Sequence, residues 1–181
     1  GDPAAHLRPT ADRVREALFN ALAGGRFGDP ITDAHVLDLF AGTGALGLEA
    51  ISRGAKYVDF VEFRPASLHA LQANIKALRV TEKARVYKKD ALPFADALPA
   101  DRYDLAFADP PYESRMLDRL IERWIKAPWS RVLVAEHAVA HQLPRAAMSV
   151  RLEDTAISIY RAAPVVPAAP VTPAVLPPSA S

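Results

Sequence analysis

A turn with three glycines constrains this chain more than any other stretch of its sequence. Gly42, Gly44 and Gly47 follow an apolar run over 36–40 that predicts a strand, and a helix is predicted over 45–53. Glycine has no Cβ, so the backbone can turn tightly and approach a ligand closely. The first turn of the helix would present free N–H groups to that ligand. The spacing G-x-G-x-x-G between a strand and a helix is typical of nucleotide-type cofactor sites, and several enzyme classes share it.

Strands and helices alternate after this turn. Strands are predicted over 57–62, 84–88, 103–108 and 131–136, and helices over 65–78 and 114–126. This alternation predicts a parallel sheet with helices on both faces. Two last strands, over 147–153 and 155–161, are too close for a crossover helix, so they should form a hairpin that adds an antiparallel strand. Ligands of such sheets bind beyond the carboxyl ends of the strands.

Prolines divide the rest of the chain. Residues 1–10 are expected to be irregular, with Thr10 capping a helix over 11–23. The segment 90–101 is expected to be broken by its prolines, and a short helix is expected over 138–143. Residues 162–181 contain six prolines and no charged residue, which predicts a disordered tail. One domain over 11–161 remains.

The composition excludes several classes of protein. The 181 residues include no cysteine, which excludes disulfides, a thiol nucleophile and cysteine-ligated zinc, and which fits a reducing cytoplasm. No apolar run is long enough to span a membrane. A net charge of +1 does not indicate a basic nucleic-acid-binding face. His137 and His141 lack the surrounding pattern of a zinc protease, so no metal site is expected.

Carboxylates follow the predicted strands. Glu62 ends the second strand, twenty residues after Gly42, where it could accept the ribose hydroxyls of an adenosine-type ligand; the alternative is a solvated surface glutamate. Asp90 and the Ala91 N–H could contact an adenine edge, or Asp90 could simply cap a helix or turn. Asp38 lies within an apolar strand, so it needs a strong partner such as a ligand ammonium group or the N–H groups of the glycine turn.

The stretch Asp109-Pro110-Pro111-Tyr112 follows the fourth predicted strand. A simple turn would explain the prolines. The combination also suits the exocyclic amine of a nucleobase, which is a poor nucleophile because its lone pair is delocalised into the ring. Asp109 and the Pro110 carbonyl could accept the two N–H bonds, while Tyr112 stacks on the base for ~1–3 kcal/mol. Rigid prolines would hold these groups in position for direct methyl transfer.

Two stretches resemble known families. Residues 38–50 (DLFAGTGALGLEA), together with the DPPY stretch, resemble class I S-adenosylmethionine-dependent methyltransferases that modify exocyclic amines. Residues 8–20 (RPTADRVREALFN) resemble the bacterial family that methylates guanine N2 in 16S ribosomal RNA. The resemblance extends to about residue 161. The short segment before Pro9 and the proline-rich tail depart from the family pattern.

The resemblance implies a Rossmann-like α/β fold: a three-layer sandwich with a seven-stranded, mostly parallel sheet and an antiparallel last strand. It implies S-adenosylmethionine as cofactor, ribosomal RNA or the small ribosomal subunit as partner, a monomer, and a cytoplasmic location. The cofactor-binding residues carried over are Thr10, Asp38, Phe40, Ala41, Gly42, Thr43, Gly44, Glu62, Phe63, Asp90 and Ala91. The target amine would be held by Asp109, Pro110, Pro111 and Tyr112.

Three alternatives stay open from the sequence. An adenine-N6 DNA methyltransferase shares the DPPY chemistry, although no target-recognition domain is visible. A nicotinamide-dependent dehydrogenase would explain the glycines and leave the DPPY stretch without a role. A non-catalytic RNA-binding assembly protein would keep the fold without the reaction.

Overall fold

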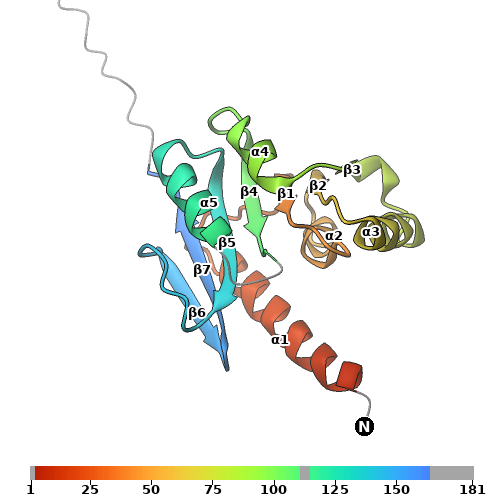
Figure 1. Cartoon of the computed structure of the whole chain (residues 1–181), viewed down its shortest axis with the longest axis horizontal. Helices are drawn as coiled ribbons and strands as arrows, with labels where there is room; N and C mark the ends of the chain where they lie inside the picture. The colour runs from red at the N-terminus through yellow and green to blue at the C-terminus, as the bar shows by residue number, and fades with distance from the viewer. Residues whose placement is uncertain (1–2, 111–114, 164–181) are drawn as a thin grey trace, which may run out of the picture.

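A seven-stranded sheet forms the centre of the protein (Figure 1). The computed structural model describes residues 3–110 and 115–163, with side chains from residue 11 onward. The strands are β1 (His35–Leu39), β2 (Tyr57–Val61), β3 (Ala84–Tyr87), β4 (Tyr103–Ala108), β5 (Ser130–Ala138), β6 (Met148–Leu152) and β7 (Thr155–Arg161). Their spatial order is β3-β2-β1-β4-β5-β7-β6. β7 runs antiparallel to both neighbours and the other strands are parallel to one another, which confirms the predicted sheet and its final hairpin.

Helices cover both faces of the sheet and complete the predicted Rossmann-like three-layer sandwich (Figure 1). One face carries α1 (Pro3–Ala23), α2 (Ala45–Ser52) and α3 (Pro65–Ala77). The other carries α4 (Ala91–Asp96) and α5 (Arg115–Lys126). A short 3-10 helix, η1 (Thr81–Lys83), leads into β3. Among the described residues, no helix combines the length and apolar character needed to cross a bilayer.

Strand residues alternate between two hydrophobic cores, because successive side chains of an extended backbone point to opposite faces. In β1, Val36 packs in the core beneath α1, α2 and α3, whereas Leu37 and Leu39 pack beneath α4 and α5. By this alternation Asp38 faces α2, in a position that would suit an apolar side chain, and it is 2% exposed. The fold therefore buries a carboxylate directly below the glycine turn.

The glycine turn meets two separate steric demands. Gly44 is the N-cap of α2 with φ +88°, a left-handed conformation that glycine adopts readily. Gly47 has an ordinary φ, but a Cβ there would lie 2.9 Å from both Phe60 Cζ and Val58 Cγ1. Gly47 therefore lets α2 lie directly on β2.

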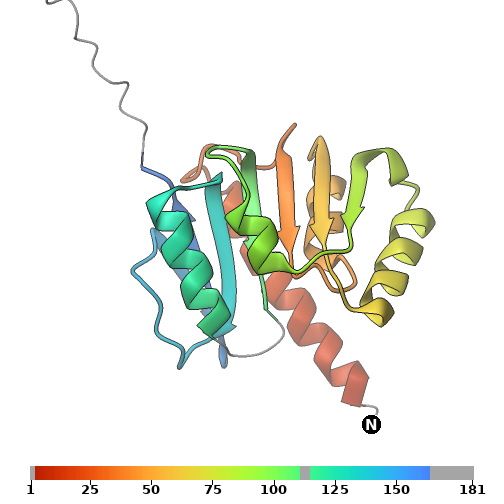
Figure 2. The same ribbon diagram turned by 45° about the horizontal axis from the view of Figure 1, so that its top comes forward.

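α1 begins earlier than predicted. Its backbone is helical from Pro3, so the expectation of irregular backbone is wrong for residues 3–10, and Thr10 lies inside the helix instead of capping it. Proline fits the first helical turn, and Ala4 and Ala5 are strong helix formers. Pro9 removes one backbone hydrogen bond without ending the helix. The N-terminal half of α1 extends past the carboxyl ends of the parallel strands (Figure 2).

Two inner segments also differ from the prediction. The expected helix over 138–143 is wrong, because β5 continues to Ala138 through its pairing with Thr155 of β7. The segment 90–101, expected to be broken, contains α4. Pro93 is the third residue of α4, where its missing N–H would have no helical acceptor in any case. The final tail lies outside the described residues except for Ala162 and Ala163.

Replacing Gly47 with alanine should lower the free energy of unfolding by about 1–3 kcal/mol, because the added methyl group overpacks the contact with Phe60 and Val58. Urea unfolding measures this change. Gly24→Ala is the matched control, since a Cβ there meets only backbone oxygens at 3.5 and 3.6 Å. Equal stability of the two variants would contradict the steric role of Gly47.

Candidate functional site

The candidate site lies at the carboxyl ends of β1 and β4, where the strand order reverses direction. In open parallel sheets, ligands bind at this switch point. Parallel register places Leu39 at the end of β1 beside both Val61 of β2 and Ala108 of β4. Four carboxyl groups gather along this edge, from Asp38, Glu62, Asp109 and Glu136.

Glu62 joins the end of β2 to the glycine turn. Its Oε1 accepts a hydrogen bond from the Gly42 N–H at 2.8 Å. Its Oε2 accepts bonds from the backbone N–H groups of Phe63 (3.1 Å) and Arg64 (2.9 Å), and from Arg64 Nε at 3.3 Å. Burial opposes ionisation, but the hydrogen bonds from Arg64 and Gly42 outweigh it and hold the pKa of Glu62 below its usual value. Glu62 is thus a fixed, ionised acceptor at the predicted ribose position.

Asp38 holds the start of α2 from below. Its Oδ2 accepts a hydrogen bond from the Gly47 N–H at 3.0 Å, one of the first-turn N–H groups that have no helical acceptor. Burial raises the pKa of Asp38 to about 8; the Gly47 bond opposes this rise, and the charge of Glu62 adds to it. A cation bound beside Asp38 would favour the ionised carboxylate.

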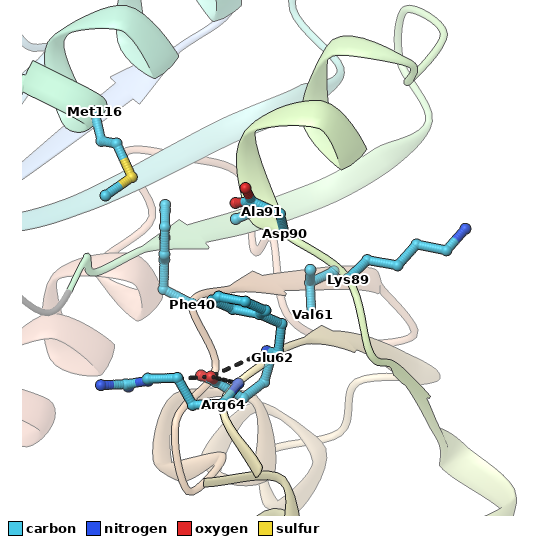
Figure 3. A pocket seen from close by; sticks show the side chains of 9 residues that line it. Phe40, Val61, Glu62, Arg64, Lys89, Asp90, Ala91 and Met116 are labelled. Carbon is cyan, nitrogen blue, oxygen red and sulfur yellow. Dashed lines mark hydrogen bonds and ion pairs between the residues drawn. The ribbon is translucent and has the colours of Figure 1, made fainter.

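A pocket opens between the ends of β1, β2 and β3 (Figure 3). Five predicted cofactor residues line it: Phe40, Glu62, Phe63, Asp90 and Ala91. Met116 of α5 extends toward Phe40 across the pocket (Figure 3).

Several features of this pocket suit a flat aromatic ligand. Phe63 is 58% exposed, which is unusual for a large apolar side chain beside a cavity. Phe40 has φ +56°, a strained conformation for a bulky residue, of the kind found at ligand sites. Asp90 is the N-cap of α4 but makes no side-chain capping bond, so its carboxylate is not used by the helix.

A second pocket adjoins the glycine turn. Its walls include Asp38, Ala41, Gly42 and Thr43 on one side and Asp109 and Pro110 on the other. The structure therefore brings the glycine turn and the start of the DPPY stretch to one cavity.

Asp109 also lines a third pocket, shared with Glu136 of β5 and with Val14, Arg15 and Leu18 of α1. Burial, followed by the nearby charges of Glu136 and Asp38, raises the pKa of Asp109 well above its usual range. Asp109 thus stands between the pocket of the glycine turn and a chamber under α1.

The predicted site residues fall into three groups. Most line the first two pockets, as described above. Gly44 lines none of the three pockets described here, because it packs against Leu71 as the N-cap of α2. The side chain of Thr10, and Pro111 and Tyr112 entirely, lie outside the described residues.

Sequence reasoning missed Glu136, Arg64 and Met116. Glu136 follows the apolar run 132–135, so a search for acidic residues at strand ends, which identified Glu62 and Asp109, would have identified Glu136 too. Arg64 lines both the pocket in Figure 3 and the pocket of the glycine turn. Met116 comes from α5, which is distant in sequence, and no local signal marks it.

The stability of the ligand-free protein should fall as pH rises from about 5 to 8, and Asp38→Asn should reduce this fall by about 1 kcal/mol or more. The folded state holds the Asp38 proton up to a pKa of about 8, whereas the unfolded chain loses it near pH 4. The folded state therefore binds more protons in this window, and deprotonation costs stability. Urea unfolding at both pH values measures the effect. Asp90→Asn, an exposed carboxylate, should follow wild type; an unchanged slope in Asp38→Asn would contradict the burial cost.

Comparisons with known proteins agree with this architecture. The family described as "Conserved hypothetical protein 95" matches residues 2–157. The ribosomal RNA small subunit methyltransferase D of Escherichia coli is 38% identical over 141 residues, covering 76% of this chain and 68% of the relative. The protein of the same name from Haemophilus influenzae is 36% identical over 126 residues, covering 68% and 62%.

Solved structures show the same fold. The Escherichia coli protein yhhF superposes with a TM-score of 0.71 at 33% identity, covering 84% of this chain and 87% of that one. An RNA methyltransferase from Salinibacter ruber, in complex with S-adenosyl-L-homocysteine, shares the fold with a TM-score of 0.63 at 13% identity, covering 87% and 95%. The chain therefore belongs to the family described as conserved hypothetical protein 95, the bacterial ribosomal RNA methyltransferase family that includes the small subunit methyltransferases D.

Proposed function

We propose that this protein transfers a methyl group from S-adenosylmethionine to the exocyclic N2 amine of a guanine in small-subunit (16S) ribosomal RNA. The observation that carries the proposal is the position of Asp109. It lines the pocket of the glycine turn on one side and the chamber under α1 on the other. A group in this position can hold an acceptor amine next to a bound methyl donor. The relatives named as ribosomal RNA small subunit methyltransferase D support the substrate class.

The pockets fit the parts of S-adenosylmethionine. Glu62 would accept the ribose hydroxyls, since among the described residues only the Gly42 N–H donates to its Oε1, which keeps a lone pair. The pocket between Phe40 and Ala91 would receive the adenine, with Asp90 at its edge. Asp38 would balance the ammonium group. The fold neighbour from Salinibacter ruber contains the demethylated form of this cofactor.

S-adenosylmethionine supplies a methyl group on a positively charged sulfur, which keeps the electron pair of the broken carbon–sulfur bond. The work left to the protein is to align and activate the amine. Asp109 accepts an N–H bond of the amine and thereby directs its nitrogen lone pair toward the methyl group. The nitrogen gains the methyl group and loses one proton, and the Asp109 carboxylate is placed to accept that proton.

A ribosomal RNA substrate would place the protein in the bacterial cytoplasm. We also propose that the protein acts as a monomer, as the family resemblance implies. Pro111 and Tyr112, outside the described residues, remain the proposed clamp and stacking partner of the target base.

Labelled S-adenosylmethionine and small ribosomal subunits that lack this methylation test the proposal. Wild type should produce N2-methylguanosine, detected by nucleoside analysis. Asp109→Ala should bind S-adenosylmethionine but react about 10²–10⁴-fold more slowly, because the amine loses its acceptor. Asp96→Ala is the control, since Asp96 is exposed at the end of α4.

Three results would contradict the proposal. The first is absence of label in wild type that binds the cofactor. The second is label in N6-methyladenosine. The third is full activity of Asp109→Ala, which would remove Asp109 from the reaction.

A further inference from the structure

Glu136 faces the same chamber as Asp109. The parallel register of β4 and β5 pairs Ala108 with Ala135, so Asp109 and Glu136 follow at the same level of the sheet. Alternation along β5 places Glu136 on the face of Val132 and Val134, which is the face that α1 covers. Both carboxyl side chains line the chamber, and they lie close enough for the charge of Glu136 to raise the pKa of Asp109.

The chamber presents two carboxyl groups as hydrogen-bond acceptors, and few positive charges lie near them. Among the described side chains, no ion pair includes Asp109 or Glu136. Arg15 also lines the chamber, but its guanidinium pairs with Asp12 at 2.9 Å and with Glu49 at 3.4 Å. The other walls are apolar, from Val14, Leu18, Val134 and Ile157 among others. A ligand that fits this chamber is flat and apolar on its faces and presents hydrogen-bond donors at one edge.

Guanine and adenine differ in the number of hydrogen-bond donors along the base edge that carries N1 and the exocyclic group. Guanine presents two neighbouring donors, N1–H and the N2 amine. Adenine presents one donor, the N6 amine, next to an acceptor, N1. Enzymes that act on an extruded base distinguish bases by hydrogen bonds to this edge. Two carboxylates therefore match guanine, whereas adenine N1 would face oxygen lone pairs.

We propose that Glu136 accepts the N1–H of the target guanine while Asp109 accepts an N–H of its N2 amine, so that the pair selects guanine over adenine. This inference rests on the proposed function. In the ligand-free protein, burial and the nearby charge of Glu136 raise the pKa of Asp109 and favour its neutral form. A positively charged methyl donor beside Asp38 and Asp109 favours the ionised Asp109 carboxylate, which offers acceptors only.

Glu136→Gln tests the inference, because the amide can accept from an N1–H through its oxygen or donate to an N1 acceptor through its nitrogen, whereas the ionised carboxylate can only accept. With small ribosomal subunits, kcat/KM for N2-methylguanosine formation should fall about 10-fold, the effect of exchanging a charged hydrogen-bond acceptor for a neutral one. Glu82→Gln, on exposed η1, is the matched control and should behave as wild type.

A binding measurement separates base selection from damage to the fold. In the presence of S-adenosylhomocysteine, guanosine is compared with 2-aminopurine riboside, which has the N2 amine but an acceptor at N1. Wild type and Glu82→Gln should prefer guanosine. Glu136→Gln should lose this preference or reverse it, a result that general destabilisation would not produce.

Two outcomes overturn the role of Glu136 while leaving the proposed function intact. In both, wild type forms N2-methylguanosine. Either Glu136→Gln keeps the wild-type rate and the preference for guanosine, or it weakens binding of both nucleosides equally, as a structural role would. If wild type instead forms N6-methyladenosine, the proposed function fails, and the selection of guanine by Glu136 fails with it.

Discussion

The alignment of parallel strand ends is the constraint on which the site depends. Pairing in register brings the carboxyl ends of β1, β2 and β4 to one edge, although the residues there are far apart in sequence. Each strand contributes an acidic residue at or near this edge, and their charges act on one another. An excess of buried negative charge is costly without partners. This edge of the sheet is therefore suited to a cationic cofactor and to a substrate that donates several N–H hydrogen bonds.

The acidic residues at this edge differ in hydrogen bonding and pKa because their surroundings differ. Glu62 accepts several N–H bonds and stays ionised, so it can act as a permanent acceptor. Among the described residues, Asp38 has one hydrogen-bond partner, the Gly47 N–H, and it has a raised pKa, so its charge depends on what binds nearby. Asp109 lies at the boundary between two pockets, where burial and the nearby charge of Glu136 raise its pKa. In the function that we propose, acidic residues thus serve structure, cofactor binding and binding of the methyl-accepting amine.

Much of this arrangement could be predicted from the sequence, because its signals are local. A glycine turn after an apolar strand, an acidic residue at a strand end and two closely spaced strands each have a short-range cause, and the sheet confirms them. The errors came from tertiary contacts and from helix tolerance of proline. Pairing with β7 replaced the helix expected over 138–143, and α1 continues through Pro9. Asp109 and Glu136 lie close together because β4 and β5 pair in a particular register, and a short stretch of sequence does not predict that register.

A crystal structure with S-adenosylhomocysteine tests the central claim most directly. The account predicts the ribose hydroxyls on Glu62, the adenine between Phe40 and Ala91, and the sulfur facing Asp109 in the pocket of the glycine turn. Density for the cofactor elsewhere, or with its sulfur turned away from Asp109, would contradict the account. Such a result would mean that the acidic residues at the strand ends do not hold the methyl donor, and that the methyl transfer takes place elsewhere.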